Sequence, residues 1–196
     1  MTSGRPPRDR REAWEAVADR VEGTLGEAKV TGKYVVTASY RSWTLTMALQ
    51  VVPGGFANSM HTRVHVPFRG RGELQLSVRR GTWFDAFQKK LRLGGYLPLE
   101  PSIARTHVVT GRPAARVRAV LGAGLSAAVA EHGAFRVDVR PWAPWIKRLQ
   151  GDETCVIEVF TPGVDTDIER MVAMFDVARR AIDALSATGV AWSNSD

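Results

Sequence analysis

Two histidines that flank an arginine are the first residues of this chain to suggest metal chemistry. His61, Arg63 and His65 lie in a run, residues 61–68, that alternates polar and apolar side chains. This period of two predicts a strand with one buried face and one solvated face. Positions i and i+4 of a strand are about 13 Å apart, so the two histidines do not bind one metal ion together. We therefore expect them on a basic, solvated strand face.

The single cysteine suggests a second chemistry. Cys155, with His107 or His132 as its base, would form a nucleophile–base pair. Residues 154–160 are largely apolar, however, and a cysteine in such a strand is expected to be a small buried core residue. The chain has no GxSxG, HExxH or CxxC motif and no phosphate-binding glycine loop. We predict no catalytic centre, no cofactor and no metal site.

The strongest candidate for contact with a partner is a segment rich in tryptophan, proline and cations, residues 140–148. Its candidate residues are Arg140, Trp142, Trp145, Lys147 and Arg148. Tryptophan and arginine are over-represented at the energetic centres of protein interfaces. Aromatic rings beside cations also stack on bases or enter a membrane surface. The sequence leaves open another interpretation, in which the tryptophans fold back over the core.

A second candidate surface lies on the polar side of the strands between residues 61 and 80. This stretch holds five arginines and one glutamate, in a chain whose net charge is +7. Arg63, His65, Arg69 and Arg71 are the residues that we expect to contact a partner there. A phosphate-binding patch is an alternative, but the polar strand positions lack the aromatic side chains on which single-strand-binding sheets stack bases.

These residues must be positioned by a mixture of strands and helices. Apolar residues at helical spacing predict four helical stretches, at residues 9–25, 82–91, 113–132 and 165–186. Alternation predicts four consecutive strands, at residues 34–40, 43–51, 61–68 and 73–79, and a further strand at 135–140. A short strand is also expected at 103–110, and residues 155–160, which are apolar on both faces, predict a more buried strand. Short links make the four consecutive strands an antiparallel meander. We expect an α+β domain whose antiparallel sheet is covered on one face by three or four helices.

Local signals predict where these elements end. Gly26 is expected to stop the first helix, and residues 69–72 are expected to form a compact hairpin link. Thr82 and Asp85 have a spacing close to that of a capping box at a helix start. Glycines within residues 122–124 are expected to divide one helical stretch into two short helices.

Length and composition limit the organisation and location of the chain. Its 196 residues suffice for one domain, and we expect a flexible tail at 1–8, a single domain at 9–186 and a loose tail at 187–196. No apolar run approaches the roughly 20 residues that cross a bilayer, and no apolar segment follows the basic N-terminus as in a secretory signal. One cysteine fits a reducing compartment, so we expect a cytoplasmic protein.

The order of elements resembles a group of uncharacterised bacterial α+β domains that has no agreed activity. The matching pieces are residues 61–67, 106–109 and 113–121, within a span of about residues 12–186. The chain departs from the pattern at residues 103–105, which read Ile-Ala-Arg where the group has an aromatic residue and an aspartate. The resemblance implies the architecture, argues against an enzyme and transfers no functional residue.

From these observations we expect a non-catalytic binding or assembly module of a bacterial cytoplasmic complex. Its partner is another protein or a second copy of the chain, bound by the basic sheet face and the tryptophan segment. Two alternatives remain open. One is a binder of an anionic ligand, such as nucleic acid or an acidic lipid surface. The other is an enzyme of unknown class.

Overall fold

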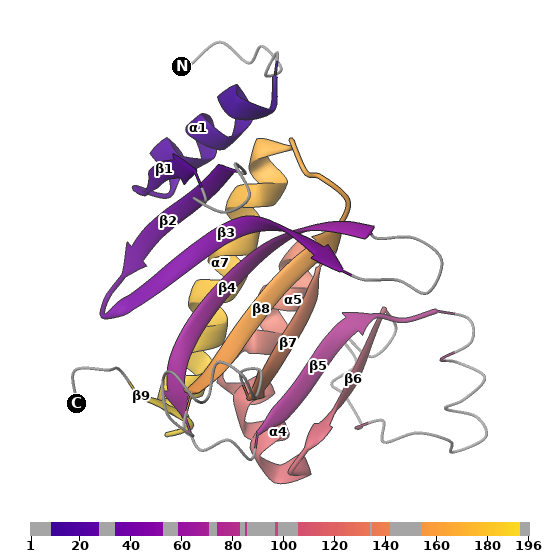
Figure 1. The fold of residues 1–196 in the computed structure, drawn as a ribbon. Helices are drawn as coiled ribbons and strands as arrows, with labels where there is room; N and C mark the ends of the chain where they lie inside the picture. Colours follow the sequence, from indigo (N-terminus) through magenta and orange to yellow (C-terminus); the bar gives the residue numbers. More distant parts are fainter. Residues whose placement is uncertain are drawn as a thin grey trace.

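A nine-stranded antiparallel sheet forms the centre of the molecule, and the helices lie on one of its faces (Figure 1). The computed structural model describes the residues in the following ranges: 9–27, 34–52, 59–70, 74–82, 85, 97, 106–133, 135–141 and 154–192. The expected α+β class, with an antiparallel sheet covered on one face by helices, is confirmed.

Among the residues that the structure describes, strands dominate the first half of the chain, and helices enter mainly in the second. In chain order the elements are α1 (Arg10–Arg20), β1 (Thr24–Glu27), β2 (Tyr34–Tyr40), β3 (Trp43–Val52), β4 (Ser59–Gly70), β5 (Gln75–Arg80), β6 (His107–Arg112), α4 (Ala114–Val120), the single π-helical turn η1 (Leu121–Leu125), α5 (Ser126–His132), β7 (Arg136–Pro141), β8 (Thr154–Pro162), α7 (Ile168–Ala187) and β9 (Ala191–Trp192).

The strand order differs from the predicted meander. The sheet runs β1-β2-β3-β4-β8-β7-β5-β6, with β9 beside β4, so the meander comprises β1 to β4. The prediction that residues 69–72 link β4 to a neighbouring β5 by a hairpin is wrong, because β8 and β7 lie between those strands. Residues 154–161 of β8 are all buried. A strand that is buried along its length belongs in the centre of a sheet. β8 therefore pairs with β4 through eight register pairs, in the position where β5 was expected.

The first helix is shorter than its apolar spacing predicts. It ends at Arg20, and the next turn places Glu22 at a φ of 56°. Gly23 then approaches β2 so closely that a Cβ atom there would lie 2.6 Å from the carbonyl oxygen of Thr37. The expected stop at Gly26 is therefore wrong, since this residue lies in strand β1 and pairs with Val35.

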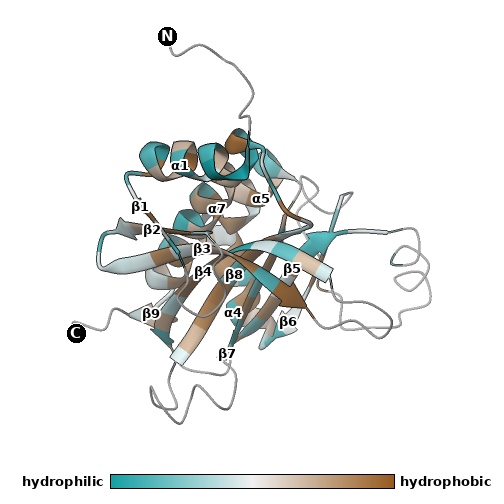
Figure 2. Cartoon of the chain, turned by 45° about the horizontal axis from the view of Figure 1, so that its top comes forward, coloured by the Kyte–Doolittle hydropathy of each residue, from teal (hydrophilic) through white to brown (hydrophobic). Residues whose placement is uncertain are grey.

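The core lies between the sheet and the helices, which gather on one side of the strands in Figure 2. The fully buried side chains include Trp14 of α1, Leu45 and Met47 of β3, and Phe175 of α7. The apolar alternation of β3 holds except at Val51, which is 41% exposed.

Two local predictions are confirmed. Thr82 and Asp85 form a capping box, in which the Asp85 amide donates to Thr82 Oγ1 (3.3 Å) and the Thr82 amide donates to Asp85 Oδ2 (2.8 Å). The remainder of the helix expected at residues 82–91 lies outside the described residues. Gly124, at a φ of 119°, breaks the helical geometry between α4 and α5.

Residues 187–192 differ from the loose segment expected at the C-terminus. Val190 is 5% exposed, and its amide donates to the carbonyl of Leu185 (2.9 Å). Ala191 and Trp192 then pair with the end of β4 as strand β9. The chain therefore continues to contribute to the core and the sheet after α7 ends.

Candidate functional site

The candidate site lies on the outer face, which is the face of the sheet opposite the helices. Two rows of side chains cross β4, β8 and β7 there, each with one residue from each strand. In register order the rows are Arg63–Phe160–Arg136 and His65–Glu158–Asp138. Because side chains alternate along a strand, both rows point away from the core that faces the helices.

Glu158 is the ionic centre of these rows. Its Oε1 accepts a hydrogen bond from Arg63 Nη1 (2.5 Å), and its Oε2 accepts one from Arg140 Nε (2.9 Å). Arg140 Nη2 also lies 2.8 Å from Oε2, at ion-pair distance. Arg63 and Glu158 are only 8% and 7% exposed. The prediction of a solvated position for Arg63 is therefore wrong. Its charge is buried beside a carboxylate that lies 95 residues away in the sequence.

Phe160 is the aromatic centre. The guanidinium carbons of Arg63 and Arg136 lie 4.8 Å and 5.2 Å from its ring centroid, at cation–π distance. The His61 ring lies 5.6 Å from the same centroid. Arg136 is also fixed by a bond from its Nε to Oδ1 of Asp138 (3.0 Å). The name Phe160 cluster is used below for the following residues: Arg63, Arg136, Asp138, Arg140, Glu158 and Phe160.

The two histidines of β4 have different surroundings. His61 Nε2 lies 3.1 Å from the Ser59 hydroxyl. Burial lowers the pKa of His65, while the charge of Glu158 opposes that shift and the charge of Arg63 reinforces it. In the described ranges, no group of three or more His, Cys, Asp or Glu side chains is placed to hold a metal ion.

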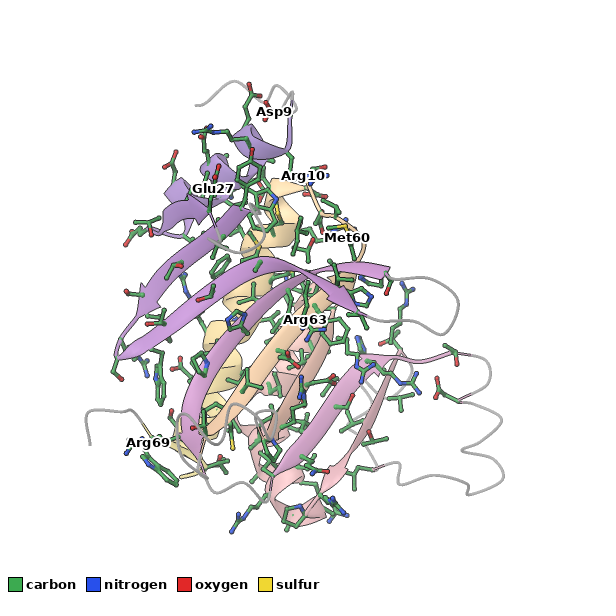
Figure 3. The ribbon with its side chains drawn as sticks, in the orientation of Figure 1. Asp9, Arg10, Glu27, Met60, Arg63 and Arg69 are labelled. Carbon is green, nitrogen blue, oxygen red and sulfur yellow. The ribbon has the colours of Figure 1, made fainter. Side chains whose placement is uncertain are left out.

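The structure joins the two predicted surfaces at one point, because Glu158 binds both Arg63 of the basic strand and Arg140 of the tryptophan segment. Arg69 lies exposed near the other end of β4, where it pairs with Trp192 (Figure 3). Some predicted contact residues lie outside the described residues: Arg71, Trp142, Trp145, Lys147 and Arg148.

Sequence reasoning missed Glu158, Phe160 and Arg136 as members of this site. A signal for Glu158 was present, because it is the one charged residue in the apolar run of residues 154–160. A carboxylate in a strand that is buried on both faces requires a cationic partner. The identity of that partner depends on register, which the sequence did not supply.

The structure keeps the candidate nucleophile and its candidate bases apart. Cys155 is buried, and its Sγ donates to the carbonyl of Gly70 (3.7 Å). His107 lies on β6, with β7 and β5 between that strand and β8. His132 lies on α5, where Nε2 is 3.1 Å from Oδ2 of Asp176. The interpretation of Cys155 as a core residue fits this arrangement.

A second arginine–aromatic group, the Tyr40 cluster, lies where the β2–β3 turn meets the helices. It comprises Tyr40, Arg41, Arg179 and Asp183. The Tyr40 hydroxyl donates to Asp183 Oδ2 (2.6 Å), and Arg41 Nη1 lies 2.8 Å from Asp183 Oδ1. Both guanidinium groups lie over the Tyr40 ring. The hydrogen bond to Asp183 is the main cause of a raised pKa for Tyr40.

In comparisons with known proteins, no family model, no curated protein and no solved structure matches this chain. The resemblance to uncharacterised bacterial domains therefore stays a prediction. None of the described helices combines the length and apolar character needed to cross a bilayer.

Proposed function

We propose that this protein is a non-catalytic binding or assembly module of a bacterial cytoplasmic complex, and that the Phe160 cluster contacts a protein partner. The observation that supports this proposal is a group of three arginines on the outer face, of which Arg63 and Arg136 lie over the Phe160 ring and Arg140 is paired with Glu158. Arginine and aromatic residues are enriched in protein interfaces. The cytoplasmic location belongs to the proposal and rests on the single cysteine.

The energetics of the buried ion pair favour a role beyond stability. β4 and β8 are already joined by eight register pairs, so Arg63 and Glu158 are not needed to bring these strands together. Burying two charges costs desolvation energy that a well-packed apolar pair would avoid. What Glu158 does provide is a fixed orientation for Arg140, whose side chain remains 46% exposed. Orienting a long side chain in advance lowers the entropic cost of binding a partner.

The pairing of charges favours a protein partner over nucleic acid or an acidic membrane surface. In the described part of the outer face, Arg63 and Arg140 share Glu158, and Arg136 pairs with Asp138. Polyanion binding depends on many cations that neutralise phosphates, and two of the three arginine charges of this cluster are already balanced by Glu158 and Asp138. Arg140 belongs to the tryptophan segment of residues 140–148, so Trp142 and its neighbours in that segment are included in the proposal as contact residues.

Charge reversal on the two faces of the molecule tests this function. Arg136→Glu changes the outer face, and Arg118→Glu makes the same change at an exposed residue of α4. Tagged full-length chains are purified from the native host, their partners are quantified by mass spectrometry, and their mass is measured by light scattering. We expect Arg136→Glu to lose a bound protein, or to convert a dimer into a monomer, while Arg118→Glu keeps the wild-type behaviour. Identical behaviour of the two variants would contradict the proposal.

A further inference from the structure

The Phe160 cluster has more hydrogen-bond donors than acceptors. Arg63 is more than nine-tenths buried, and its Nε has no hydrogen-bond partner. Within the described chain its single bond runs from Nη1 to Glu158. A buried guanidinium that uses so few of its five N–H groups is uncommon and calls for an explanation.

Arg136 presents its unused donors to solvent. Its Nε is bonded to Asp138 and its side chain is 46% exposed. In the part of the chain that the structure describes, its two Nη groups make no hydrogen bond. Contacts with the Phe160 ring and with Asp138 restrict the Arg136 guanidinium and leave its fork of Nη groups at the surface.

The cluster also carries an excess of positive charge. It contains three guanidinium groups and two carboxylates, so one positive charge is not balanced within it. At a partly buried site the lower effective dielectric strengthens attraction for an anion. One excess charge matches one carboxylate better than a doubly charged phosphate. A guanidinium fork also matches carboxylate geometry through two parallel hydrogen bonds.

We propose that the Phe160 cluster binds a carboxylate side chain from an acidic segment of the protein partner. This inference rests on the proposed function. The Nη groups of Arg136 hold the carboxylate, and Arg63, in the same row across the sheet, supplies a buried positive charge. Phe160, Asp138 and Glu158 are positioning residues that orient the arginines.

The test uses the full-length protein and a hexaglutamate peptide at constant ionic strength. Arginine Nε–Hε signals are followed by NMR, and we expect those of Arg136 and Arg63 to shift while that of Arg118 does not. Loss of charge-assisted hydrogen bonds in Arg136→Gln is expected to weaken peptide binding about tenfold. Arg118→Gln removes one charge from α4 and is expected to bind like wild type. Arg136→Lys keeps the charge but loses the fork, so its affinity should lie between those of wild type and Arg136→Gln.

Three results would overturn the inference. Equal affinities of Arg136→Gln and Arg118→Gln would show that hexaglutamate responds only to net charge. A second titration with inorganic phosphate would identify a phosphate site if phosphate shifted Arg136 and hexaglutamate did not. In a third outcome, Arg136→Glu loses its protein partner, but peptide binding does not depend on Arg136. That result would overturn carboxylate recognition alone, because the Phe160 cluster would still be a contact surface for the partner.

Discussion

The Tyr40 cluster and the Phe160 cluster use the same chemistry at two places in the fold. In each, two guanidinium groups lie 4.8–5.6 Å from an aromatic centroid. Carboxylates pair with both arginines over Phe160, whereas over Tyr40 a carboxylate pairs with Arg41 and a backbone carbonyl accepts from Arg179. The Tyr40 cluster links segments that no strand pairing connects, since Asp183 of α7 binds the β2–β3 turn and Arg179 donates to Val21 at the end of α1 (3.2 Å). The Phe160 cluster links three strands that are already paired.

This difference indicates that an arginine–aromatic group is structural where it joins separate elements. Where the backbone already provides the connection, the same group is available for binding. The following substitutions test that distinction, and they are ordered by the size of the expected effect on stability.

The largest effect is expected from Glu158→Leu. The substitution leaves Arg63 buried without a counter-charge, so the free energy of unfolding should fall by about 3–5 kcal/mol. Urea denaturation followed by circular dichroism measures this change. The double variant Arg63→Met, Glu158→Leu should regain most of the loss, because it removes the buried charge as well. A double variant as unstable as Glu158→Leu would mean that the ion pair itself stabilises the sheet, as a structural cluster would.

A smaller effect is expected from Asp183→Asn in the Tyr40 cluster. The substitution removes the charged acceptor of Tyr40 and Arg41, and because the Asp183 side chain is 35% exposed the loss should be about 1–2 kcal/mol. Partner binding should not change. The control is Glu15→Gln on α1, whose surface pair with Arg11 within the same helix should contribute little to stability. If both variants lose the same free energy of unfolding, the proposed structural role of the Tyr40 cluster is contradicted.

The smallest effect is expected from the pH dependence of His65. Burial lowers its pKa below 6.5 in the folded protein, so its contribution to stability is present above the unfolded pKa and is lost as the pH falls through the folded pKa. His65→Gln should therefore lose less stability than wild type between pH 7 and pH 5. Urea denaturation at several pH values measures the difference. If the free energy of unfolding falls equally with pH in wild type and in His65→Gln, the acid destabilisation has another source.

The spacing of apolar residues predicted many of the strands and helices, because the buried face of an element is visible in its own sequence. Residues 135–140 form a strand as their alternation indicates, residues 155–160 form one as their apolar run indicates, and the helix expected at 165–186 appears as α7. The pairing of strands was less predictable. A hairpin after β4 is the shortest connection, yet the apolar strand β8 takes that position. The short edge strand β1 has four residues, too few for alternation to stand out from the end of the preceding helix.

The candidate site was predictable only in part, for the same reason. Arg63 and Arg140 were named from their types, whereas the residues that connect them were not. Glu158 joins two arginines that lie 95 and 18 residues away from it in the sequence. Only the antiparallel register of β4, β8 and β7 brings these side chains together, and register depends on long-range contacts.

Photo-crosslinking compares the two clusters most directly. A photoreactive amino acid replaces Arg136 in one full-length chain and Arg41, an exposed member of the Tyr40 cluster, in another. Both proteins are irradiated in the native host, and their covalent adducts are quantified. We predict a protein adduct of defined mass from position 136 and none from position 41. An adduct from position 41 alone, or equal yields from both positions, would contradict the assignment of partner binding to the Phe160 cluster.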